Sequence, residues 1–267
     1  MMRFISFGSG SSGNCYLLYT DTDALFIDAG VGVRALKKYF RDYGLSMSKV
    51  KHILITHDHA DHIKCVGSLS YDYQLPVYAT QIVHDGIDRN YCVSRKVSAG
   101  LRRIVQPGNT FTMGDFIVTP FTVPHDSSDN VGYHIQADGV TFTIITDAGS
   151  VTDEMALYIN RSNYLVIEAN HDIEMLRQGS YPQHLKVRIA CPTGHLSNVT
   201  CAETIAKNMS EQLRYVWLCH LSAENNHPEL ARKTVETILR SYGIIPGVDF
   251  NLTVLKRTMP TGIFELT

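Results

Sequence analysis

The chain has 267 residues, 44% of them hydrophobic and 19% charged, so it is long enough for one large domain with a substantial core. Its formal net charge of −2 excludes a global basic field that would attract nucleic acid, so any such binding must use local patches. No apolar run approaches the roughly 18 residues of a membrane span. Six scattered cysteines without a C-x-x-C pair, and a start without a signal-peptide pattern, predict a cytoplasmic protein with reduced thiols.

Three strands are predicted at the start of the chain, over residues 3–6, 15–19 and 24–27. The Gly/Ser-rich loop between the first two can wrap an anion with its backbone N–H groups, or it can be a plain flexible hairpin. On the first interpretation, Ser11 and Asn14 of this loop are candidate substrate-binding residues. The third strand ends in Asp28, which can orient metal ligands or can form a turn with Gly30.

A dense group of metal-ligand residue types follows the next buried strand, over residues 50–55. The segment T-H-D-H-A-D-H spans residues 56–62 and contains His57, His59, Asp61 and His62. In a short turn the first two side chains can face one ion, and the last two can face a second ion close by. Imidazole and carboxylate ligands without a thiolate suit zinc, manganese or iron. The alternative is a polar surface loop, but H-x-H-x-D-H puts many ligand types into six residues.

The most basic stretch of the chain lies between the two halves of the predicted fold. Before it we expect helices over residues 33–43 and 80–89 and a short strand over residues 77–79. Residues 90–103 then contain Arg95, Lys96, Arg102 and Arg103. Such a stretch is either a solvated face or a contact for the phosphate backbone of DNA.

The second half repeats the pattern of strands that end at candidate ligands. Strands are predicted over residues 116–123, 131–136, 141–145, 164–167 and 215–219. The residues that follow the strand ends are His125, Asp147, Glu168 and His220. Helices over 152–160, 198–209 and from 228, and closing strands over 250–255 and 262–266, complete the order. This order predicts an α/β sandwich of two sheets packed face to face with helices outside.

The order of these motifs resembles that of the metallo-β-lactamase superfamily over nearly the whole chain. The five matching positions are Asp28, the histidine block, His125, Asp147 and His220. The resemblance implies one αββα domain over residues 1–267, with halves of about 1–110 and 111–267, and a dinuclear metal site on one edge. It implies one ion on His57, His59, His125 and Asp147, and another on Asp61, His62, Asp147 and His220. The two divalent ions would be zinc or manganese, with iron as a further option.

Finer motifs are similar to particular branches of the superfamily. Residues 9–14, 194–198 and 220–226 resemble the YycJ (WalJ) branch, a bacterial group associated with DNA exonuclease activity. The segments around Glu168 and His195 are similar to those of transfer-RNA 3′-processing nucleases. The resemblance implies that His195 is a general acid, that Glu168 orients it, and that Asp61 holds the attacking water.

Three hypotheses follow from the sequence. The first is a metal-dependent phosphodiesterase with DNA as its partner, in particular a DNA exonuclease. The second is a hydrolase of a small molecule, namely a cyclic phosphodiester, a thioester or a lactone. The third is a non-catalytic metal-binding regulatory module, which the complete set of ligand types argues against.

Overall fold

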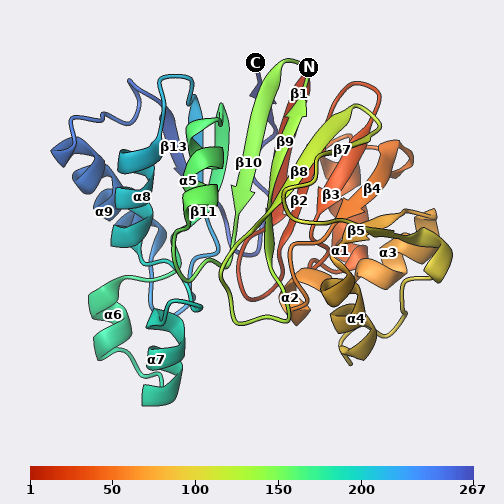
Figure 1. The fold of residues 1–267 in the computed structure, drawn as a ribbon, viewed down its shortest axis with the longest axis horizontal. Coiled ribbons are helices and arrows are strands. Elements are labelled where there is room, and N and C mark those ends of the chain that lie inside the picture. The colour runs from red at the N-terminus through yellow and green to blue at the C-terminus, as the bar shows by residue number, and fades with distance from the viewer.

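Two seven-stranded sheets face each other at the centre of the fold, and helices cover their outer faces (Figure 1). The computed structural model describes all 267 residues. The first sheet has the order β14-β1-β2-β3-β4-β5-β6, and the second has the order β13-β12-β11-β10-β9-β8-β7. Antiparallel and parallel pairs occur in both sheets. The predicted αββα sandwich is therefore confirmed.

The strands coincide closely with the apolar runs of the sequence. The first sheet contains β1 (Met2–Gly8), β2 (Cys15–Tyr19), β3 (Ala24–Ile27), β4 (Val50–Leu54), β5 (Val77–Ala79), β6 (Arg102–Ile104) and β14 (Phe264–Leu266). The second contains β7 (Phe111–Met113), β8 (Phe116–Thr122), β9 (Val131–Ala137), β10 (Val140–Ile145), β11 (Tyr164–Glu168), β12 (Tyr215–Cys219) and β13 (Asn251–Val254). Many of these strands are buried on both faces, which explains their nearly continuous hydrophobic sequences.

The last strand crosses between the two halves of the molecule. β13 closes the second sheet, whereas β14 pairs antiparallel with β1 of the first sheet, with Met2 opposite Leu266. The two chain termini consequently lie side by side (Figure 1). The expected boundary near residue 110 falls between β6 and β7. However, the first sheet also includes β14 from the end of the chain.

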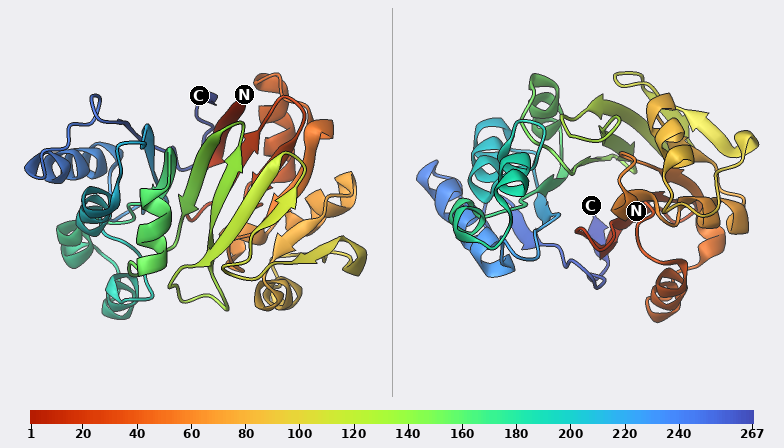
Figure 2. Two further views of the ribbon diagram at one scale, coloured as in Figure 1. Left: turned by 45° about the horizontal axis from the view of Figure 1, so that its top comes forward. Right: turned by 90° about the horizontal axis from the view of Figure 1, so that it is seen from below.

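Helices flank the sandwich on both sides, as the two further views show (Figure 2). On the first sheet lie α1 (Val33–Asp42), α2 (Ala60–Ile63), α3 (Val66–Tyr73) and α4 (Gln81–Arg89), with the short 3₁₀ turns η1 (Met47–Lys49) and η2 (Ala99–Leu101). On the second lie α5 (Asp153–Asn160), α8 (Asn198–Asn208) and α9 (Pro228–Ser241). A helical hairpin of α6 (Ile173–Gln178) and α7 (Gln183–Ala190) projects beyond α8 and α9 (Figure 1). No helix combines the length and the hydropathy needed to cross a bilayer.

The hydrophobic core has three parts, one between the sheets and one under each helical layer. Successive residues of a strand point to opposite faces, so Phe4 packs between the sheets and Ile5 packs under the helices of the first layer. The ring centroids of Phe4 and Trp217 are 4.8 Å apart, which joins the first sheet to the second. This packing holds the carboxyl ends of the parallel strands of both sheets along one edge.

Candidate metal centre and active site

Three candidate site residues occupy a rare backbone conformation just past the ends of strands. Asp28, Asp147 and His220 follow β3, β10 and β12, and their φ angles are 60°, 54° and 52°. Asp and His adopt the left-handed region more readily than most non-glycine residues, but the conformation is still uncommon. Backbone strain of this kind clusters at functional sites because the surrounding fold holds it in place. Here it turns three buried polar side chains towards the same edge of the sandwich.

The loop after β4 is tied to the strand beside it by Asp28. Asp28 Oδ1 accepts a hydrogen bond from the backbone N–H of Thr56 at 2.9 Å, and Oδ2 lies 2.7 Å from His62 Nδ1. This contact occupies one ring nitrogen of His62 and leaves the other, Nε2, for the interior of the site. A Cβ on Gly30 would lie 1.6 Å from the carbonyl oxygen of Asp61, so only glycine permits this close packing of the two loops.

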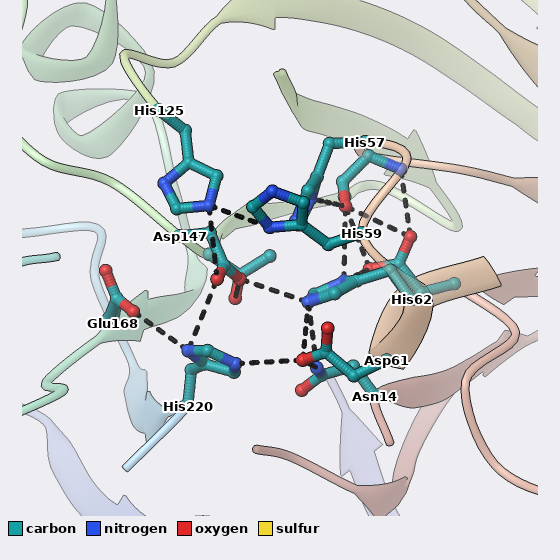
Figure 3. Close-up of polar contacts among 12 residues, drawn as sticks. Asn14, His57, His59, Asp61, His62, His125, Asp147, Glu168 and His220 are labelled. Carbon is teal, nitrogen blue, oxygen red and sulfur yellow. Dashed lines mark hydrogen bonds and ion pairs between the residues drawn. The ribbon is translucent and has the colours of Figure 1, made fainter. Parts of the chain in front are cut away.

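The seven expected ligands come together at this edge (Figure 3). One group consists of His57, His59 and His125, and a second consists of Asp61, His62 and His220. Asp147 lies between the two groups. Its Oδ2 is 3.2 Å from His62 Nε2, and its Oδ1 is 3.7 Å from His125 Nε2 and 3.4 Å from His220 Nδ1.

The donor atoms of this cluster fit divalent cations. His57 is buried, its Nδ1 lies 3.0 Å from Thr56 Oγ1, and its Nε2 has no hydrogen-bond partner. A buried nitrogen without a partner is costly, and a metal ion would satisfy it. Burial lowers the pKa of His220, but Asp147, Asp61 and Glu168 outweigh burial and raise that pKa to about 10. The negative potential that stabilises a proton there also favours a cation.

A buried carboxylate positions the candidate acid beside the cluster. Glu168 ends β11, and its Oε1 lies 2.8 Å from His195 Nδ1 and 3.0 Å from His220 Nδ1. Burial raises the pKa of Glu168, but the charges and hydrogen bonds of the two histidines outweigh it and lower that pKa to about 2. Burial lowers the pKa of His195, but Glu168 outweighs this effect and raises it. Glu168 is therefore ionised and orients His195 through Nδ1, so that Nε2 can deliver a proton.

In the Gly/Ser-rich loop, Asn14 and Ser11 were expected to bind substrate, and the structure places the two side chains in different surroundings. Asn14 is fully buried, and its Nδ2 donates to Asp61 Oδ2 at 3.1 Å and lies 2.8 Å from His62 Nε2. Its Oδ1 accepts from the backbone N–H of Gly10 at 2.7 Å. The position of Asn14 therefore does not support a direct contact with substrate, because its polar atoms orient two candidate ligands instead. Ser11 is exposed and borders a cavity of about 220 Å³ that His195 and His220 also line.

The basic stretch is mostly engaged within the protein. Arg95 and Arg102 each form an ion pair with a nearby aspartate, and Lys96 donates to backbone oxygens at the end of α4. Arg103 is exposed, and its guanidinium donates only to backbone oxygens. None of the four forms a hydrogen bond or ion pair with the metal-ligand cluster. Arg103 is consequently the one basic side chain of the four that is exposed and donates only to backbone oxygens of its own segment.

One ion pair at the edge of the cluster was not predicted from the sequence. Asp126 Oδ1 lies 3.5 Å from His125 Nε2 and 3.8 Å from His59 Nε2. Arg188 of α7 contacts the same carboxylate through Nε and Nη2, the latter at 3.1 Å. Asp126 directly follows a motif histidine, which was a usable signal, whereas nothing in the sequence pointed to Arg188.

Comparison with known proteins assigns the family. A model described as the β-lactamase superfamily domain matches residues 24–217, which is most of the chain. The chain belongs to this superfamily. The family implies divalent metal ions, in agreement with the ligand cluster, and together with the exodeoxyribonuclease relatives described next it shows that the chain is a metal-dependent hydrolase.

Relatives within the superfamily match the chain from end to end. Exodeoxyribonuclease YycJ of Bacillus anthracis is 35% identical over 262 residues, covering 98% of this chain and 98% of that protein. Exodeoxyribonuclease WalJ of Streptococcus pneumoniae is 35% identical over 264 residues, covering 99% and 98%. The crystal structure of Zn(2+)-bound PqqB from Methylobacterium extorquens superposes with a TM-score of 0.73 at 16% identity, covering 97% of this chain and 99% of that chain. This last similarity establishes the fold alone.

Proposed function

We propose that this superfamily member is a dinuclear-metal-dependent phosphodiesterase that acts as a DNA exonuclease. The observation that carries the proposal is the pair of Glu168 and His195 beside the ligand cluster, with His195 Nδ1 3.7 Å from Asp147 Oδ1. An alkoxide expelled from a phosphodiester is a strong base, so its departure needs a positioned acid. The thiolate of a thioester belongs to a thiol with a pKa near 8.5 and leaves with far less help.

The ligand groups support a division into two metal positions. We assign one ion to His57, His59, His125 and Asp147, and the other to Asp61, His62, His220 and the shared Asp147. The donors are nitrogen and oxygen without sulfur, which favours zinc or manganese and also permits iron. When bound, two such ions lower the pKa of water from 15.7 to about 7 and neutralise charge on the phosphate oxygens.

The protein's own groups then position the reactants. Asp61 accepts a hydrogen bond from the attacking water, and Asn14 holds the Asp61 carboxylate in the required orientation. His195 donates the proton on Nε2 to the leaving oxygen, while Glu168 retains the hydrogen bond to Nδ1. A positioned acid of this kind typically accelerates the reaction 10²–10⁴-fold.

DNA is the proposed substrate because the end-to-end relatives are called exodeoxyribonucleases. With a net charge of −2, the attraction to DNA must be local, and the exposed Arg103 is one candidate contact. We place the protein in the cytoplasm within the same proposal, in keeping with its six free thiols.

A substrate screen tests the reaction class. The purified protein is loaded with manganese or with zinc and given bis(p-nitrophenyl) phosphate, single-stranded DNA, RNA, a thioester and a lactone. We expect turnover of the phosphodiesters, with DNA preferred over RNA. Turnover of the thioester or lactone without any phosphodiester cleavage would replace the proposal by the small-molecule hydrolase. Two bound ions without any turnover would favour the regulatory module.

A further inference from the structure

A cavity of about 500 Å³ lies between the α6–α7 hairpin and the start of α8. Its wall includes His171, Ile173, Arg177, Lys186, Val187 and His195. The candidate acid thus borders this cavity, whereas none of the seven candidate metal ligands does. The cavity therefore adjoins the candidate acid His195 but is not lined by the candidate metal ligands.

A smaller cavity occupies the other side of α7. It has a volume of about 220 Å³, and its wall contains Ser11, Arg188, His195 and the candidate ligand His220. His195 thus lines both cavities, whereas the candidate ligand His220 lines only the smaller one. The α7 helix separates these spaces, since Lys186 and Val187 face the larger cavity and Arg188 faces the smaller one.

The geometry of phosphoryl transfer distinguishes the two spaces. In an in-line displacement, the attacking and leaving oxygens lie on opposite sides of phosphorus. The attacking water belongs at the metals, and the leaving oxygen must reach His195. The group attached to the leaving oxygen consequently extends from His195 away from the ligand cluster, into the larger cavity.

The wall of the larger cavity has the chemistry of a nucleoside site. Its volume lies within the 300–1,000 Å³ range of small-molecule sites. Ile173 and Val187 are 49% and 58% exposed, and α7 contributes no buried residue to the core, so these apolar side chains are available to a base. His171 is only 4% exposed, and its Nδ1 has no hydrogen-bond partner within the protein. The imidazole of His171 thus forms part of the cavity wall beside the two apolar side chains.

The hairpin also brings positive charge to the cavity. The ammonium group of Lys186 makes one hydrogen bond, to the backbone oxygen of Arg177, and therefore has donors to spare. Arg177 forms an exposed ion pair with Glu174, which is weak enough for a phosphate to displace. A nucleoside in the cavity would carry its next phosphate towards these two cations.

We infer that this cavity binds the nucleoside on the leaving-group side of the scissile phosphate, and that Lys186 and Arg177 hold the phosphate that follows it. The inference rests on the proposed phosphodiesterase function and adds the position of the departing strand. It gives the α6–α7 hairpin a role in binding DNA, whereas its contribution to the core is small.

Negative charge introduced into the cavity tests the inference. Val187→Glu and Lys186→Glu place a carboxylate in the cavity from positions on the surface of α7. The matched controls are Val248→Glu, at a valine that is 77% exposed in a distant loop, and Lys233→Glu on the exposed face of α9. The probes are a short oligothymidylate, whose leaving group is a nucleoside that carries the rest of the strand, and bis(p-nitrophenyl) phosphate, which expels a small phenolate.

The two cavity variants should lose about tenfold to hundredfold in kcat/KM on the oligothymidylate, mainly through KM, because Lys186→Glu removes a charge-assisted contact with the phosphate and Val187→Glu places a carboxylate where the base packs. Their loss on the phenolate substrate should be about tenfold smaller, and neither control should lose activity on either substrate. Equal losses on both substrates, or a loss shared by the controls, would overturn the assignment of the cavity. A wild-type protein that cleaves neither substrate would overturn the phosphodiesterase proposal together with the inference.

Discussion

His195 Nδ1 lies 2.8 Å from Oε1 of Glu168, a carboxylate that is completely buried at the end of β11. The second oxygen of Glu168 accepts hydrogen bonds from the backbone N–H groups of Ala148 and Leu196, at 2.9 and 3.2 Å. The carboxylate is therefore fixed on both sides, and it holds the imidazole in one tautomer and one orientation. This arrangement suits a group that must deliver a proton to a defined point.

The role of His195 can be separated from metal binding by the choice of leaving group. His195→Ala should lower kcat on DNA by roughly 10²-fold or more, because the leaving oxygen no longer receives a proton. Cleavage of bis(p-nitrophenyl) phosphate should be nearly preserved, because nitrophenolate departs without protonation. Metal content, measured by elemental analysis, should not change. A similar loss on both substrates would instead indicate misfolding or a lost ligand.

Because Asp147 lies between the two ligand groups, its replacement should change the number of metal ions that the chain binds. We expect the wild-type protein to bind close to two transition-metal ions per chain after reconstitution. Asp147→Ala should bind one ion or none, since this carboxylate contacts both ligand groups. His59→Ala should also lower the metal content. Elemental analysis that finds no bound metal in a fully active wild-type protein would refute the dinuclear site.

Asp28 should influence metal affinity without binding metal itself. Asp28→Asn preserves the volume and tolerates the left-handed backbone at φ 60°, but it removes the charge that faces His62 Nδ1. Losing an outer partner of this kind typically weakens metal binding 10–100-fold. Competition with a chromophoric chelator measures the change, and thermal unfolding of the metal-free variant serves as the control. Unaltered affinity would show that Asp28 serves only the turn.

The sequence predicted the candidate site better than it predicted the periphery of the fold. Asp28, Asp147 and His220 each follow a buried apolar strand, and parallel strands bring such ends to one edge. The positions of these residues at the ends of predicted strands therefore indicated from the sequence alone that they would lie close together. The left-handed backbone at all three residues was not predictable, because it depends on contacts made after the sheets pack.

The α6–α7 hairpin was missed for a physical reason. Leu185, Val187 and Ile189 alternate with polar residues, a spacing typical of a strand, yet they lie in the helix α7. Because α7 buries none of its residues, no core contact imposes the helical period that sequence reasoning depends on. β6 and β7 were also missed, since each has only three residues and little buried surface.

The pH dependence of stability should include a contribution from His134 on β9, away from the ligand cluster. Burial lowers its pKa to about 4, and its Nδ1 lies 2.8 Å from Thr143 Oγ1. Below pH 6.5 the unfolded chain binds a proton at this residue that the folded chain excludes, so stability falls as the pH drops from 6.5 towards 4. The expected contribution is roughly 2 kcal/mol between pH 7 and pH 5.

His134→Gln keeps a partner for Thr143 but cannot titrate. Urea unfolding at both pH values should therefore show a smaller decrease in the free energy of unfolding for the variant than for the wild-type protein. An identical decrease in both proteins would contradict the buried, neutral state of His134.

Digestion of DNA of defined ends tests the central proposal most directly. Linear DNA labelled at either the 5′ or the 3′ end, and closed circular DNA of the same sequence, are incubated with the manganese- or zinc-loaded protein. We predict that labelled linear DNA releases nucleotides progressively from one end and that the closed circle stays intact. Cleavage of the circle as fast as the linear form would contradict the requirement for an end, and cleavage of neither DNA with either metal would contradict the proposed function.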